Sequence, residues 1–218
     1  MTVMLASFKN EIDALRDTGA LFHQNRWSLG TSSNYSIVLG RDPLRLLLTA
    51  SGKDKRCLRP TDFVLVDHLG KLLEPSAEKP SAETGLHLAI AHQPDVGSVL
   101  HTHSVWATLL SDLYADKGGF WIEGYEMLKG LADVPTHEHR QWVEIFPNSQ
   151  DLPALAGRVQ QRLKDADDPL RHGFLIRRHG LYTWGRDLHE ARRHVEIYEF
   201  LFEVLGRELS IQANGHAV

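Results

Sequence analysis

The chain has 218 residues, of which 42% are hydrophobic, which is enough apolar material for the core of one large domain spanning residues 1–218. Its formal charge is −4 and its 24 Lys and Arg residues are spread along the sequence, which argues against a nucleic-acid-binding groove. A single cysteine, Cys57, excludes an internal disulfide; Met1–Phe8 lacks the basic start of a signal peptide, and no apolar stretch approaches the roughly 20 residues of a membrane span. We therefore expect a soluble cytoplasmic protein.

Apolar residues at helical spacing predict an amphipathic helix from Phe8 to Leu21, with Gly19 as its stop. Two clusters of small polar residues follow, at 27–34 and 49–53, each beside a predicted strand. Hydroxyl, amide and backbone N–H groups in such turns can hold an anion, and a lysine adds the positive charge that phosphate favours. Ordinary turns are the alternative. The candidate phosphate ligands are Asn34, Ser51, Gly52 and Lys53 in these clusters and Ser81 further along the chain.

A strand is predicted over 62–67, followed by a helix that reaches His92. Ser81 is its candidate N-cap, and Glu83 lies in the first turn, where a carboxylate meets the positive end of the helix dipole. Glu83 also stands just upstream of the next strand. It is therefore either a helix-capping carboxylate or a group that faces a metal ion.

The apolar run 96–103 ends in two histidines one residue apart, His101 and His103. In a strand, residues two apart point to the same face, so both imidazoles can bind one metal ion. With 13 histidines in 218 residues, chance alone produces about one His-x-His pair, and His137–His139 is a second one in a predicted loop. The strand context of the first pair favours a metal site over two core histidines.

A helix capped by Ser104 or Thr102 is predicted to follow directly, over 104–110. Glu126 then stands in the mostly apolar segment 120–130. Apolar surroundings disfavour an ionised carboxylate, which is the condition for a general acid or base near neutral pH. The alternative is a solvated helical residue that pairs with Lys129.

The last third of the chain predicts a strand at 143–146, a helix at 151–164 capped by Asp151, and two strands over 173–185. The two strands meet near His179, which is the candidate third metal ligand, and the glycine after it allows close backbone approach. An amphipathic helix begins at 187. His172 and His194 are expected to be exposed.

Three imidazoles without a thiolate suit zinc, and equally iron, manganese, cobalt or nickel, and they leave coordination positions open for a substrate. A cation held in this way can polarise a carbonyl and stabilise the enediolate that forms when a neighbouring carbon loses its proton. The polar turns would anchor the other end of a small sugar phosphate.

These residues, in this order and spacing, resemble the class II aldolase and adducin superfamily. Within it, three segments resemble the methylthioribulose-1-phosphate dehydratases of methionine salvage. The residues that carry the wider resemblance are Asn34, Ser51-Gly52, Ser81-Ala82-Glu83, His101-Thr102-His103 and His179-Gly180; the segments that carry the narrower one are 101–104, 125–130 and 177–185.

The resemblance implies a three-layer α/β/α fold with a largely antiparallel central sheet, one zinc ion on His101, His103 and His179, and a homotetramer. It also implies a hydro-lyase that removes water from 5-methylthioribulose 1-phosphate, with Glu126 as acid and base. Glu83 matches the catalytic glutamate of the aldolases. The alternatives are a sugar-phosphate aldolase or epimerase on the same fold and a non-catalytic adducin-like module, which should lack the metal histidines.

Overall fold

The computed structural model describes residues 3–165 and 170–215. Its helices are α1 (Val3–Ala6), α2 (Lys9–Gln24), η1 (Lys55–Cys57), α3 (Thr84–Ala91), α4 (Val105–Leu113), η2 (Ala115–Lys117), η3 (Glu126–Gly130), α5 (Leu152–Leu163) and α6 (Leu188–Gly215). Its strands are β1 (Asn34–Arg41), β2 (Leu44–Thr49), β3 (Phe63–Asp67), β4 (Ser98–Thr102), β5 (Gly119–Glu123), β6 (Arg140–Phe146), β7 (Gly173–Ile176) and β8 (Gly180–Gly185).

The strands form one sheet in the order β3-β2-β1-β4-β8-β7-β6-β5. Neighbouring strands are antiparallel except β6 and β7, which are parallel. The expected α/β class is confirmed, with a sheet that is mixed but largely antiparallel. β4 lies in the middle, where His101 is opposite Asn34 of β1 and Tyr182 of β8.

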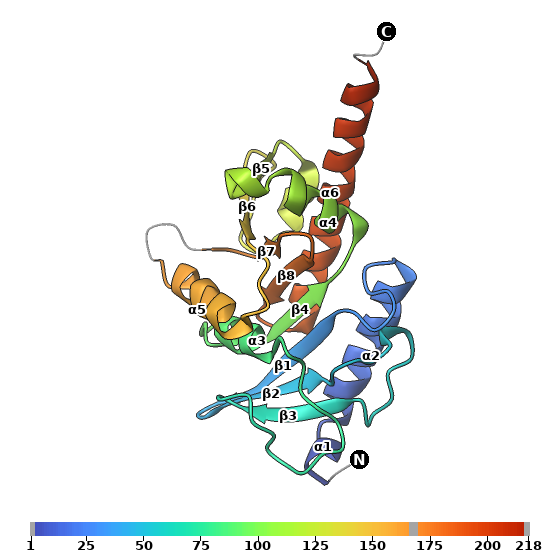
Figure 1. Cartoon of the computed structure of the whole chain (residues 1–218), viewed down its shortest axis with the longest axis vertical. Helices are drawn as coiled ribbons and strands as arrows, with labels where there is room; N and C mark the ends of the chain where they lie inside the picture. The colour runs from blue at the N-terminus through green and yellow to red at the C-terminus, as the bar shows by residue number, and fades with distance from the viewer. Residues whose placement is uncertain (1–2, 166–169, 216–218) are drawn as a thin grey trace.

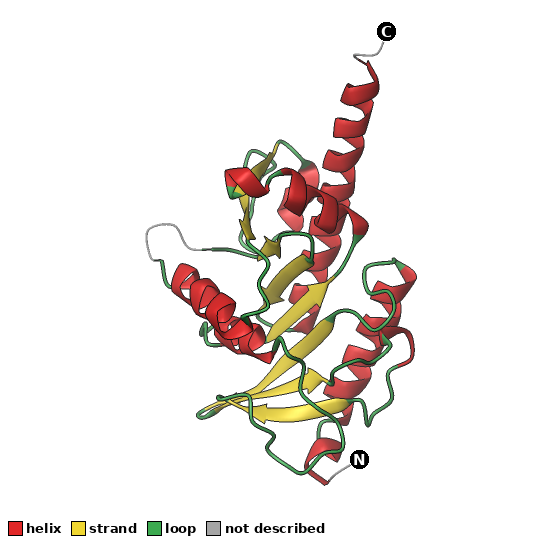
Figure 2. Cartoon of the chain, in the orientation of Figure 1, coloured by secondary structure: helices red, strands yellow, loops and turns green. Residues whose placement is uncertain are grey.

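Helices cover both faces of this sheet (Figures 1 and 2). Leu46 and Leu48 of β2 pack into the same core as α3 and α5, whereas Leu47 between them packs into the core that contains residues of α2 and α6. Because consecutive side chains of a strand point to opposite faces, a strand buried on both sides is apolar throughout. This explains the unbroken leucine run that marks β2 in the sequence.

Most predicted helices begin where expected. Ser104 caps α4 by accepting a hydrogen bond from the N–H of Ala107, and Asp151 caps α5 in the same way. The predicted stop at Gly19 is wrong, because α2 continues to Gln24. This glycine is needed for packing instead: a Cβ atom there would lie 2.6 Å from the carbonyl oxygen of Lys55.

The expected exposure of His172 and His194 is also wrong. His172 is 9% exposed and His194 only 2%, and their rings lie in edge-to-face contact with centroids 5.2 Å apart. The position of His194 off the main apolar stripe of α6 suggested solvent, but β8 and the segment after η3 cover that side of the helix and bind its imidazole. Within the described ranges, the model contains no helix with both the length and the apolar character needed to cross a bilayer.

Candidate metal centre

Three histidines converge at the end of β4. His101 lies in the strand, His103 directly after it, and His179 in the turn that joins β7 to β8. One ring nitrogen from each lies within 4.8 Å of the others. The ring centroids of His103 and His179 are 4.6 Å apart, and that of His101 is 4.5 Å from the first and 5.0 Å from the second.

The register of the sheet brings these distant residues together. β4 and β8 are antiparallel with Thr102 opposite Leu181, so the chain after β4 runs level with the chain before β8. Gly180 permits the close approach that was expected of it, since a Cβ atom there would collide with the carbonyl oxygen of Thr102. The structure thus places His179 against the other two imidazoles.

The protonation of the cluster suits metal ligation. Burial holds the pKa of His101 well below its usual value, and burial followed by the neighbouring His101 and His179 lowers the pKa of His103 to about 2. Nδ1 of His101 lies 2.9 Å from the carbonyl oxygen of Leu181, which can only accept, so this nitrogen carries the hydrogen. Nε2 of His101 therefore presents its lone pair toward the cluster.

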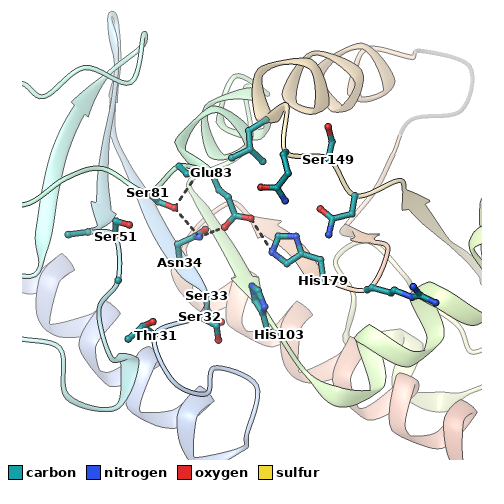
Figure 3. A pocket seen from close by; sticks show the side chains of 17 residues that line it. Thr31, Ser32, Ser33, Asn34, Ser51, Ser81, Glu83, His103, Ser149 and His179 are labelled. Carbon is teal, nitrogen blue, oxygen red and sulfur yellow. Dashed lines mark hydrogen bonds and ion pairs between the residues drawn. The ribbon is translucent and has the colours of Figure 1, made fainter.

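Glu83 lies against the histidines. Its Oε1 is 3.2 Å from Nε2 of His179 (Figure 3), and its Oε2 is 3.7 Å from Nε2 of His101. Asn34 holds Oε2 by donating a hydrogen bond of 2.5 Å, and Ser81 accepts one from the backbone N–H of Glu83. The sequence left the role of Glu83 open. It is in fact the N-cap residue of α3, but its carboxylate makes no capping hydrogen bond and faces the histidines.

A cavity of about 490 Å³ opens over this cluster. Among the residues that line it are both predicted polar turns and the start of α3: Thr31, Ser32, Ser33, Asn34, Ser51, Gly52, Ser81 and Glu83. In Figure 3, Ser51 and Ser81 lie on one side of Glu83, and His103 and His179 on the other. The structure therefore brings together the candidate anion-binding residues, with one exception, and the candidate metal ligands.

The exception is Lys53, a predicted phosphate ligand that pairs with acidic side chains instead of lining the cavity. Its Nζ is 2.6 Å from a carboxylate oxygen of Glu78 and 3.3 Å from one of Asp62, and the residue does not line the cavity. The two acidic side chains therefore pair with the ammonium group. The sequence could not reveal this, because Glu78 reaches the turn only through tertiary packing.

A different lysine of the same segment is buried. Lys55 is 1% exposed, and its Nζ donates a hydrogen bond of 2.7 Å to the carbonyl oxygen of Lys53. Burial lowers the pKa of Lys55 to about 8, whereas nearby Asp54, Asp62 and Glu83 act in the opposite direction. Sequence reasoning missed Lys55 because an isolated lysine in a polar turn is normally solvated.

Of the two alternatives for Glu126, the structure confirms the solvated residue that pairs with Lys129, and the apolar surroundings are absent. Its side chain is 71% exposed at the start of η3, and Lys129 donates a 2.6 Å hydrogen bond to it. This hydrogen bond lowers the pKa of Glu126 instead of raising it. Glu126 does not line the cavity formed by its own chain.

Two groups of cavity residues were missed. Asn148, Ser149 and Gln150 lie between β6 and α5, and their sequence has the polar-turn character that identified the other two turns. Arg178 directly precedes His179 and has a left-handed φ of 53°. Its Nε forms an ion pair with Oδ2 of Asp112 at 2.9 Å. Nothing local in the sequence indicates that Arg178 reaches the cavity.

The donor set fits a divalent cation. Nε2 of His103 lies 2.8 Å from Nε2 of His101, so two nitrogens of neutral rings face each other in a buried position. Oε1 of Glu83 and Nδ1 of His179 are buried without a hydrogen bond from any residue that the structure describes. Uncompensated buried polar atoms are costly, and a shared cation is a common reason for such an arrangement.

Comparisons with known proteins show which family the chain resembles. A family model described as "Class II Aldolase and Adducin N-terminal domain" matches residues 13–205. A methylthioribulose-1-phosphate dehydratase of Pectobacterium atrosepticum is 50% identical over 179 residues, which are 81% of this chain and 84% of that protein. One from Pseudomonas aeruginosa strain UCBPP-PA14 is 47% identical over 196 residues, 89% of this chain and 93% of that protein.

Solved structures share the fold at low sequence identity. An L-fuculose 1-phosphate aldolase superposes with a TM-score of 0.73 at 19% identity, covering 93% of this chain and 88% of that one. A sugar-phosphate aldolase from Thermotoga maritima superposes with a TM-score of 0.69 at 20% identity, covering 94% and 97%. At such identities the likeness concerns the fold alone.

Proposed function

Because the chain belongs to the class II aldolase and adducin family and, within it, to the methylthioribulose-1-phosphate dehydratases, we propose that it removes water from 5-methylthioribulose 1-phosphate. The product is 5-methylthio-2,3-diketopentyl 1-phosphate, in methionine salvage. The observation that carries this proposal is the convergence of His101, His103 and His179 beside Glu83, in a chain about half identical to proteins of that name.

The proposed reaction needs an anchored phosphate, an acidified C3 proton and a group that moves that proton. Ser51, Gly52 and Ser81 with Asn34 offer hydroxyl, backbone and amide donors to the phosphate. A divalent cation on the three histidines, for which we propose zinc, supplies a Lewis acid that makes a proton next to a carbonyl easier to remove. A carboxylate takes the proton from C3 and returns it to the C4 hydroxyl, which leaves as water, and the enol product tautomerises to the diketone.

Two carboxylates share this work in the proposal. Glu83 lies in the cavity of its own chain, where Oε1 accepts no hydrogen bond from the described residues and remains free to take a proton. Glu126 is the acid and base that the resemblance implies. Since Glu126 is exposed and outside its own cavity, we assign it to the cavity of a neighbouring subunit in a homotetramer.

Mixed oligomers test this assignment. We expect Glu126→Gln and His103→Ala subunits to be inactive alone, because each lacks one part of every site. Unfolded and refolded together, they should regain activity, since some sites then combine an intact histidine cluster with an intact Glu126. Mixtures that stay inactive, while wild-type protein refolded in the same way recovers, would place Glu126 elsewhere.

The compartment and the domain organisation complete the proposal. We place the protein in the cytoplasm, consistent with the single exposed Cys57 and with relatives that are enzymes of metabolism. We treat residues 1–218 as one domain, which the single eight-stranded sheet supports.

The decisive assay is turnover of 5-methylthioribulose 1-phosphate by purified protein, before and after a chelator and again after zinc is restored. Dehydration that is lost and regained in step with zinc supports the proposal. A second assay, coupled to detection of a released aldehyde, separates dehydration from C3–C4 cleavage by an aldolase. Aldehyde release without diketone formation would replace the proposal with the aldolase alternative.

A further inference from the structure

Behind Glu83, three buried polar side chains form a connected row. Asn34 donates to Oε2 of Glu83, its Oδ1 is hydrogen-bonded to Nε2 of His87, and Nδ1 of His87 lies 2.7 Å from Oγ of Ser36. Asn34 and Ser36 are on β1 and His87 is on α3. Asn34 is 5% exposed, Ser36 1% and His87 0%, so water does not compete for these hydrogen bonds. Figure 3 shows Asn34 beside Ser81 and Glu83.

The chemistry of the partners fixes the direction of every hydrogen bond. A carboxylate only accepts, so Asn34 must turn its NH2 group toward Glu83 and its carbonyl oxygen toward His87. Nε2 of His87 must then donate, which leaves Nδ1 to accept from the hydroxyl of Ser36. Burial lowers the pKa of His87 to about 4, so the ring is neutral at pH 7 and has the one donor and one acceptor that this arrangement needs.

The row determines which carboxylate oxygen of Glu83 is available to accept a proton. Oε2 is tethered by Asn34, whereas Oε1 lies 3.2 Å from Nε2 of His179 without a hydrogen bond from the described residues. If His87 did not donate to it, the amide of Asn34 could rotate by half a turn and direct its own oxygen at Glu83. The carboxylate would then be repelled from the position in which it faces the histidines.

We propose that His87 is a positioning residue: it fixes the amide of Asn34, which in turn holds Glu83 with one oxygen free toward His179. His87 touches neither the cavity nor the cluster of metal-binding histidines and acts through Asn34. The inference rests on the role proposed for Glu83. Its alternative is a purely structural histidine, packed edge-on against Tyr182 with ring centroids 6.0 Å apart.

Three variants separate positioning from packing. His87→Leu removes both ring nitrogens at similar volume, and His87→Gln restores one donor toward Asn34 and one acceptor toward Ser36. His194→Leu is the matched control. His194 is also buried and hydrogen-bonded at both ring nitrogens, but it packs against His172 and has no contact with the row behind Glu83 among the hydrogen bonds of the described residues. For each variant, kcat, KM, metal content and Tm are measured on the full-length protein.

We expect His87→Leu to lower kcat by roughly 10–100-fold, as is typical when a group that orients a site residue is lost, with a smaller change in KM. His87→Gln should recover most of that loss. His194→Leu should lower Tm without lowering kcat. A His87→Leu enzyme that keeps kcat within about twofold of wild type, or a folded His87→Gln enzyme no better than His87→Leu, overturns the proposal.

A spectroscopic measurement on the wild-type protein does not depend on turnover. The ¹⁵N chemical shifts of labelled histidine, with the His87 signals assigned from their absence in His87→Gln, report which ring nitrogen carries the hydrogen. We expect the Nε2–H form. An Nδ1–H form overturns the inference even if dehydration is observed, whereas an Nε2–H form without dehydration counts against the proposed function and not against the row.

Discussion

Among the described residues, a pair of buried histidines and a cluster of buried and half-buried ones differ in the partners of their ring nitrogens. In the pair of His172 and His194, all four nitrogens have a protein partner. Those of His172 face Gln141 Oε1 at 3.0 Å and Ala132 O at 2.8 Å. Those of His194 face Trp184 O at 2.7 Å and the N–H of Ala132 at 3.1 Å.

The cluster of His101, His103 and His179 differs. Among the residues that the structure describes, Nδ1 of His101 is the one ring nitrogen of this cluster that is hydrogen-bonded to the backbone. Nε2 of His101 and Nε2 of His103 face each other, and Nε2 of His179 faces Glu83. Burial lowers the pKa of a histidine in both groups, so low pKa values do not distinguish them. The difference is that the lone pair of His194 accepts a hydrogen bond from the N–H of Ala132, whereas ring nitrogens of the cluster converge on one point without such a donor.

The largest expected effect is on the converging cluster. His179→Ala removes one of the three proposed ligands, so we expect metal affinity to fall by roughly 100-fold or more and dehydration to be lost with it. Metal content after dialysis against buffered zinc, measured together with turnover, checks this. Unchanged metal stoichiometry and affinity would remove His179 from the site.

The next largest effect is a loss of turnover with the proposed metal ligands intact. Glu126→Gln leaves the histidines untouched, so metal content should stay at the wild-type level. Turnover should fall by roughly 10²–10⁴-fold, which is the usual size of a general acid–base contribution. Glu123→Gln, at an exposed carboxylate paired with Arg140, serves as the control and should keep wild-type turnover. If Glu126→Gln turns over at the wild-type rate, the acid–base assignment is wrong.

A substitution in the pair of His172 and His194 should lower stability and leave metal binding unchanged. His194→Leu leaves the carbonyl of Trp184 and the N–H of Ala132 without their partner, and we expect a loss of about 3 kcal/mol in the free energy of unfolding. In a chain of this size this lowers Tm by roughly 6–12 °C. Calorimetry and metal analysis on the same sample test the contrast, and a loss of metal at constant stability would contradict it.

The smallest effect is a pH dependence of stability beneath the converging cluster. Glu199 on α6 is 2% exposed and accepts a 3.2 Å hydrogen bond from Thr102, the residue before His103. Burial raises the pKa of Glu199 to about 7, from 4.5 in the unfolded chain. The folded state therefore holds a proton that the unfolded state releases, and this stabilisation is complete below pH 4.5 and is lost as pH rises through 7.

A shift of this size corresponds to a change on the order of 3 kcal/mol between pH 4.5 and 8. Urea unfolding of wild-type protein and Glu199→Gln at several pH values measures it. We expect the amide variant, which cannot ionise, to lose this part of the pH dependence. Parallel curves for the two proteins would show that Glu199 does not titrate in this range.

Much of the fold follows from local patterns. The run of apolar residues at 96–100 and the paired strands around His179 were predicted because strand alternation and glycine turns are visible over a few residues. Two polar turns that line the cavity were predicted for the same reason. Gly19 shows the limit, since a glycine that ends a helix and one that makes room for a neighbouring carbonyl look the same in sequence.

Charged and polar side chains were predicted less well. Lys53 lies in a polar turn typical of a phosphate site but forms ion pairs with Glu78 and Asp62. Lys55, two residues further on, is buried. The two lysines differ only in what the fold packs against them. The two alternatives for Glu126 were also decided by packing, because its apolar neighbours in sequence do not enclose its carboxylate in space.

Residue types, strand periodicity and turn composition are properties of short segments, so the sequence indicated the secondary structure, the pair His101 and His103, and the polar turns. Which histidines leave their lone pairs free depends on contacts between residues far apart in the chain, such as His101 with Leu181 and His194 with Ala132. A buried nitrogen is a potential ligand only when no carbonyl or amide is within reach, and packing alone sets that distance.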